Sequence, residues 1–140
     1  MIIDSIRNFI KDCPHLSSLT KAINVNYLDR EANSYSIEET PCEPIIKSYI
    51  NGDCIKRYNF VLASREIYSN DVMQNLDNSK FYERFSDWID ECNYNGNLPV
   101  LDNNKEAKEI KVTTNGYIFD AEMDRCQYQI QMSLKYYHKK

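Results

Sequence analysis

The sequence predicts an α+β domain: a mostly antiparallel, mixed sheet with an N-terminal helix and a long helix packed on one face. Three observations lead to this class. Polar and apolar residues alternate strictly near the C-terminus, an Asn-Gly pair separates two apolar runs, and two other segments space their apolar residues as helices do. A chain of 140 residues is expected to form one domain, over residues 1–140.

The segment 125–137 is predicted to be a long, half-buried antiparallel strand, because side chains alternate between the two faces of a strand. One face is apolar: Cys126, Tyr128, Ile130, Met132, Leu134 and Tyr136. The other is rich in amides and begins with Gln127, Gln129 and Gln131. That second face either meets water, which is the simpler interpretation, or meets another protein chain.

The N-terminal third is predicted to hold one helix and two short strands. Apolar residues recur at spacings of three and four over 2–13, and Pro14 disfavours helical geometry in the residue before it. Residues 15–21 add at most one further turn. Alternation then indicates strands over 23–27 and around 35–37, the second closing at Pro41.

Two strands, 45–50 and 54–65, are predicted to form a hairpin around Asn51 and Gly52. This pair best tolerates the positive φ angles of a two-residue hairpin turn. Both faces of the return strand are apolar over 58–63, which favours a central strand covered on both sides.

A long helix is predicted from Asp71, which can form a capping box with Gln74, to Gly96. A slip in the apolar spacing near 77–79 indicates a kink or break. Phe85 and Trp88 are expected to lie against the sheet near Tyr58, Phe60 and Ile130, and truncating Trp88 to alanine is expected to cost about 3–5 kcal/mol. Residues 97–108 are expected to form a loop.

The apolar phase of the next strand, 110–119, flips at Asn115 and Gly116. A β-bulge with Gly116 in the left-handed region inserts one residue and explains the flip. A tight hairpin at the same pair is the competing interpretation, but it leaves too short a strand afterwards. Residues 120–124 are expected to turn into the final strand.

Composition and spacing exclude several kinds of site. The net charge is −4, and a basic stripe that could neutralise nucleic-acid phosphates is missing. The five cysteines are at least twelve positions apart, which excludes a zinc cluster or a CxxC motif and favours reduced thiols in a cytosolic protein. Neither His15 nor His138 belongs to a recognisable catalytic arrangement. We therefore expect no catalytic residue, cofactor or metal, no signal peptide and no membrane span.

Several segments spread over nearly the whole chain carry a resemblance to a known family. They are 24–28 (NVNYL), 35–39 (YSIEE), 58–66 (YNFVLASRE), 71–76 (DVMQNL), 81–85 (FYERF) with Trp88, 96–99 (GNLP) and 116–120 (GYIFD). Together they resemble small proteins encoded among the tail genes of phages, and of phage-derived elements, in Firmicutes. These proteins are often labelled minor capsid or tail proteins, and their gene context points to tail terminators.

The resemblance implies a structural protein, not an enzyme. Six copies would form a ring that caps the tail tube, stops its polymerisation and joins tail to head, and in contractile tails the ring could also hold the last sheath layer. The implied partners are further copies of the chain and the tube protein, with the sheath protein and the head–tail connector as further candidates, and DNA only in transit through the lumen. The implied location is the tail of the virion or of a phage-derived particle, after assembly in the bacterial cytoplasm.

Candidate contact residues lie on two loops and on the amide-rich face. These are Asn51 and Gly52 at the hairpin tip, Asn103 in the loop 97–108, and Gln127, Gln129 and Gln131. A neutral lumen surface would let DNA pass without gripping its phosphates. The alternative from another class is a small intracellular enzyme or ligand-binding domain without a recognisable motif.

Overall fold

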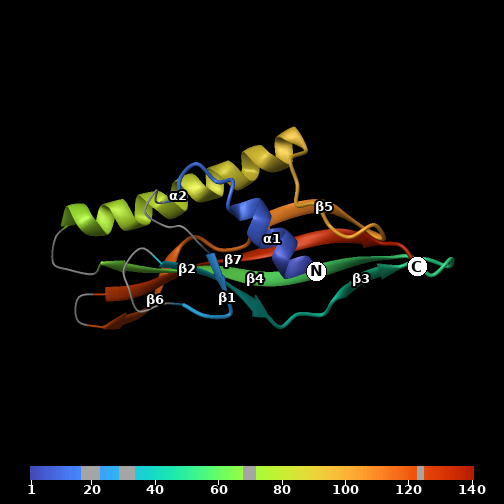
Figure 1. Cartoon of the computed structure of the whole chain (residues 1–140), viewed down its shortest axis with the longest axis horizontal. Coiled ribbons are helices and arrows are strands. Elements are labelled where there is room, and N and C mark those ends of the chain that lie inside the picture. The colour runs from blue at the N-terminus through green and yellow to red at the C-terminus, as the bar shows by residue number, and fades with distance from the viewer. Residues whose placement is uncertain (17–22, 29–33, 68–71, 123–124) are drawn as a thin grey trace.

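The computed structural model describes residues 1–16, 23–28, 34–67, 72–122 and 125–140 (Figure 1). In these residues a seven-stranded sheet dominates a mixed α+β fold with two helices, which confirms the predicted class. The elements in chain order are α1 (Ile2–Ile10), β1 (Ile23–Val25), β2 (Ser34–Thr40), β3 (Ile45–Ser48), β4 (Cys54–Ile67), α2 (Val72–Asn95), β5 (Lys105–Val112), β6 (Tyr117–Glu122) and β7 (Arg125–His138).

Strands β4 and β7 form the central ladder of the sheet. They pair antiparallel over 14 residues each, from Cys54 opposite His138 to Ile67 opposite Arg125, a length of about 45 Å. Strands β2 and β3 share the other edge of β4, and β5 and β6 share the other edge of β7. Only β1 and β2 pair in parallel among the described strands, so the sheet is mixed but mostly antiparallel.

The core lies between the helices and one face of the sheet, and Figure 1 shows α1 and α2 on the same side of it. The apolar face of the last strand is buried there, as its alternation predicts. Phe85 of α2 is fully buried, also as expected. Trp88 is only partly buried and stacks on Phe9 of α1, with ring centroids 5.1 Å apart. The tryptophan therefore joins the two helices.

The first helix and the first strand are both shorter than predicted. Helix α1 ends at Ile10, because the N–H groups of Asp12 and Cys13 turn to carbonyls three residues earlier instead of four. Strand β1 ends at Val25, because Asn26 adopts a left-handed conformation with φ of 54°. Most of the further turn expected over 15–21 lies outside the described residues.

The β3–β4 hairpin is confirmed, but its predicted two-residue turn is wrong. The N–H of Tyr49 donates to the carbonyl of Asp53 (2.8 Å), and the N–H of Gly52 donates to the carbonyl of Tyr49 (3.1 Å), which leaves a three-residue loop. Gly52 has a positive φ of 93° and Asn51 does not, whereas the two-residue turn needs it at both. On the return strand Phe60, Val61, Leu62 and Ala63 are all buried, which confirms burial on both faces.

Helix α2 is one continuous run through residues 77–79, so the expected break is absent from the described helix. The proposed capping residue Asp71 lies outside the described residues. The loop after α2 is shorter than predicted, since β5 already begins at Lys105. Five of the eight residues of β5 (KEAKEIKV) are charged, which hides its strand character from a search for apolar alternation.

The irregularity at Asn115 and Gly116 is neither of the two predicted forms. Strands β5 and β6 run in the same direction along β7, which rules out a hairpin between them. Val112 pairs with Met132 and Tyr117 with Gln129, so four residues (113–116) face two (130–131), and the insertion is of two residues, not one. Strand β6 also continues to Glu122, so residues 120–122 belong to a strand and not to the expected turn.

The φ angle of Gly116 is not positive, so this glycine is not a left-handed bulge residue. Its role is steric. A Cβ at this position would lie 2.5 Å from Cβ of Tyr82 and 2.6 Å from its Cγ. The glycine therefore lets the interrupted strand approach α2 closely.

Candidate functional site

The described residues carry no recognisable metal-binding or membrane-spanning element. Within the described ranges no group of three or more His, Cys, Asp or Glu residues could hold a metal ion. Every described cysteine is a free thiol, and Cys13, Cys92 and Cys126 are buried. Neither described helix is long and apolar enough to cross a membrane.

The hairpin tip at Asn51 and Gly52 is tied to the C-terminal residues through Asp53. One carboxylate oxygen of Asp53 accepts from the hydroxyl of Tyr137 (2.5 Å) and the other from the N–H of Lys140 (2.9 Å). The side-chain amide of Asn51 makes two hydrogen bonds with Asp53, both at 3.1 Å. Its Nδ2 donates to Oδ2 of Asp53, and its Oδ1 accepts from the backbone N–H of Asp53. This network orders an exposed tip that would otherwise fray.

The tip is expected to loosen in acid. The Lys140 N–H, followed by the Tyr137 hydroxyl, holds the pKa of Asp53 below its ordinary value of 3.8. A depressed carboxyl pKa stabilises the fold above the ordinary value, and the stabilisation is lost as the pH falls through the folded-state value. In NMR spectra the amide signal of Lys140 is expected to titrate with a midpoint below 3.8. Asp53→Asn is the control and removes the titration; a wild-type midpoint at or above 3.8 contradicts the role of these contacts.

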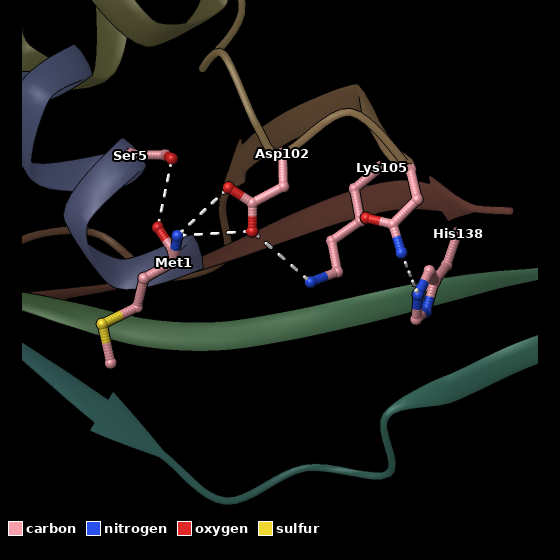
Figure 2. Close-up of polar contacts among 6 residues, drawn as sticks. Met1, Ser5, Asp102, Lys105 and His138 are labelled. Carbon is pink, nitrogen blue, oxygen red and sulfur yellow. Dashed lines mark hydrogen bonds and ion pairs between the residues drawn. The ribbon is translucent and has the colours of Figure 1, made fainter.

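The loop containing Asn103 packs against both ends of the chain, and Asn103 itself is exposed. In Figure 2 the amino group of Met1 faces both carboxylate oxygens of Asp102, at 3.3 and 3.4 Å, and Nζ of Lys105 lies 3.8 Å from Oδ2. Asn104 contacts Nε2 of His138 at 3.2 Å. These exposed ion pairs contribute little stability each. The loop is placed beside the end of β7 by Asn104, whose side chain contacts His138 and whose carbonyl accepts from the N–H of Lys139.

The three glutamines differ in their surroundings. Gln129 is buried and donates from Nε2 to the Tyr117 hydroxyl (2.7 Å), to which Gln131 also donates (3.1 Å). Gln127 is half-buried and donates from Nε2 to Oε1 of Gln129 (3.5 Å), whereas Gln131 is exposed. Because Tyr117 engages the Gln129 amide inside the chain, Gln131 is the glutamine best placed to meet water or a partner.

A groove of about 280 Å³ lies further along the same face of the sheet, and the sequence did not predict it. Three cationic side chains and one carboxylate contribute to it. Nε of Arg57 and Oδ1 of Asn59 are buried there without a hydrogen-bond partner among the described residues. The lining residues come from β3, β4, β5 with its following turn, and β7: Ile46, Arg57, Asn59, Glu109, Lys111, Thr113, Ser133 and Lys135.

The structure separates the predicted contact residues into two groups. The hairpin tip and the Asn103 loop lie at one end of the β4–β7 ladder, since Cys54 and Lys105 both pair with His138. The glutamines lie toward the other end, where Gln127 pairs with Arg65. No single site therefore unites all six residues.

The sequence did not predict that two edge strands carry exposed apolar side chains. Ile45 and Ile46 of β3 and Ile118 and Phe119 of β6 are all exposed. The sequence predicts strands over 45–50 and 110–119, but only the strand order reveals that β3 and β6 each pair with one neighbour among the described strands. A signal was present nevertheless, because the segment 45–50 holds three isoleucines and one tyrosine around a single lysine.

No protein-family model matches this chain, and no curated protein matches it significantly.

Proposed function

We propose that this chain is a tail terminator, a structural protein that forms a ring, typically of six copies, on the end of a phage-type tail tube. The ring stops tube polymerisation and offers the surface to which the head, or its connector, attaches. The proposal extends to a sheath contact in contractile tails and to DNA passing through the lumen. The site of action is the tail of a virion or of a phage-derived particle.

The observation that carries the proposal is that apolar side chains remain exposed on strands at the edges of the sheet. Both described helices lie on one side of the sheet, and exposed apolar residues stand on edge strands at opposite ends of the ladder. Exposed apolar groups beside unpaired strand edges are typical of contact with other chains. The segments that resemble the terminator family indicate the kind of assembly to expect, which is a ring on the end of a tail tube.

The groove qualifies the expectation of a neutral lumen. Gln127, Gln129 and Gln131 are uncharged, but the same sheet face continues to Lys135 and Arg57. If that face lines the channel, its basic end would slow DNA at the rim while the glutamine end lets it pass.

Removing the chain from a particle-producing strain is expected to abolish control of tube length. Tubes would grow past the normal length and stay headless, because nothing closes the growing end. Negative-stain electron microscopy measures this directly, and labelled protein restored in trans is expected at the head-proximal end alone. Label along the whole tube would instead make the chain a tube or sheath subunit.

A small ligand-binding domain is the second candidate, and the groove is the observation that favours it. Arg57, Lys111 and Lys135 outnumber Glu109, so the groove suits an anionic group. The same experiment separates the two functions. A ligand-binding domain would leave tube length and head attachment unchanged when it is removed.

A further inference from the structure

Free strand edges are the surfaces at which one sheet can join another. In the described part of the chain, β1, β3, β5 and β6 each pair with one neighbour only. Strand β1 has three residues, too few to template a partner. Strand β5 carries five charged residues in eight, a composition that protects an edge against pairing: Lys105, Glu106, Lys108, Glu109 and Lys111.

The edges of β3 and β6 lack this protection. Ile45 and Ile46 on β3 are 52% and 42% exposed, and Ile118 and Phe119 on β6 are 44% and 62% exposed. An exposed charge stands beside each apolar pair, and the two charges have opposite signs: Lys47 on β3 and Asp120 on β6. The two edges are therefore matched in both apolar character and charge.

The positions and directions of the two strands also match. Strand β3 lies on the β2 side of the sheet at the Cys54 end of β4, and β6 lies on the β5 side at the Arg125 end of β7. Because β3 runs against β4, β7 against β4, and β6 against β7, β6 and β3 run in opposite directions. A second copy in the same orientation, moved sideways and along the strands, thus brings its β3 antiparallel to β6 of the first.

We propose that β6 of one copy pairs antiparallel with β3 of the next, so that the sheets of neighbouring copies join head to tail. Such a contact uses two different surfaces of one chain and leaves one of each free on every pair. Repetition gives a ring when the rotation between neighbouring copies closes after a whole number of them, and an open filament otherwise. This inference rests on the proposed ring-forming function and names the surfaces that build the ring.

Pairing of like edges is less favourable. A β3–β3 contact brings two copies of Lys47 together, and a β6–β6 contact brings two copies of Asp120 together, whereas the mixed contact places lysine near aspartate. The mixed contact also continues the sheet without reversing a subunit. A single kind of like-edge contact stops at a dimer and cannot form a ring.

Two single substitutions test the pairing, each blocking one edge with a charge that the facing edge repels. Ile45→Glu blocks β3, Phe119→Lys blocks β6, and Tyr94→Lys, at an exposed site near the end of α2, is the matched control. Analytical ultracentrifugation is expected to show wild type and Tyr94→Lys associating beyond the dimer as concentration rises. Each blocked variant alone is expected to stay monomeric, with an unchanged circular-dichroism spectrum.

Mixing the two blocked variants is the decisive step. Phe119→Lys retains an intact β3 and Ile45→Glu an intact β6, so the mixture is expected to form dimers and to stop there. A charge exchange adds a second check: Lys47→Glu and Asp120→Lys each weaken association, and the double variant restores it.

Three results overturn the inference: wild type that remains monomeric, a blocked variant that still associates by itself, or a mixture that stays monomeric. A dimer formed by one blocked variant alone indicates a like-edge contact. None of these results depends on tube capping. Tubes that remain capped by the blocked variants leave the terminator function standing and place the ring contact elsewhere.

Discussion

Replacing Phe85 by alanine is expected to lower the free energy of unfolding by about 3–5 kcal/mol. The side chain is fully buried between α2 and the sheet, 6.1 Å from the Phe81 ring and 6.0 Å from the Trp88 ring. Truncation removes its burial and leaves a cavity that the surrounding rings fill only in part. Urea denaturation followed by circular dichroism measures the loss.

Trp88→Ala is the matched comparison on the same helix. Because Trp88 is only partly buried and stacks mainly on Phe9, its truncation is expected to cost less than that of Phe85, contrary to the estimate of about 3–5 kcal/mol made from the sequence. Two equal losses would mean that the tryptophan is as deeply buried as the phenylalanine. An unchanged midpoint for Phe85→Ala would mean that α2 does not cover the sheet.

Gly116→Ala is expected to destabilise the fold by about 1–3 kcal/mol through overpacking. The added methyl group would stand 2.5 Å from Cβ of Tyr82, which sits on the backbone of α2 and cannot move away as the end of a long side chain could. Tyr82 is itself held by its hydroxyl, which lies 2.5 Å from Oγ of Ser64. Thermal unfolding with the wild type alongside measures the effect.

Gly96→Ala separates the steric effect from a conformational one. Gly96 has a positive φ of 74°, and a methyl group added there would meet no described atom within 4 Å, so alanine strains the backbone without a clash. A Tyr82→Ala background supplies the second control, because removing the ring beyond Cβ relieves part of the clash at Gly116. Equal costs of Gly116→Ala in both backgrounds would show that Tyr82 is not the obstacle.

Periodicity alone identified most of the secondary structure. Alternation over 125–137 predicted β7, and the isoleucine and phenylalanine spacing over 2–13 predicted α1, because such patterns report which side of an element is buried. The Asn-Gly pair predicted the β3–β4 hairpin. It did not predict the loop length, which depends on how Tyr49 and Asp53 pair across the strands.

The sequence could not predict which strands lie at an edge, which side chains contact one another or where the groove lies, because each depends on residues far apart in the chain. The sequence places Gln129 among the candidate contact residues, but its side-chain amide donates to the hydroxyl of Tyr117, twelve positions earlier in the chain. The sequence predicts that Gly116 is a left-handed bulge residue, but the position requires glycine because Tyr82 of α2 leaves no room for a side chain.

The sequence by itself determined the α+β class, the long final strand and the lack of a familiar catalytic motif, since these follow from local spacing and composition. Only the tertiary structure decided that β3 and β6 stand at free edges on opposite sides and opposite ends of one ladder. The physical reason is strand register. Pairing over long sequence distances settles which apolar side chains enter the core and which remain exposed.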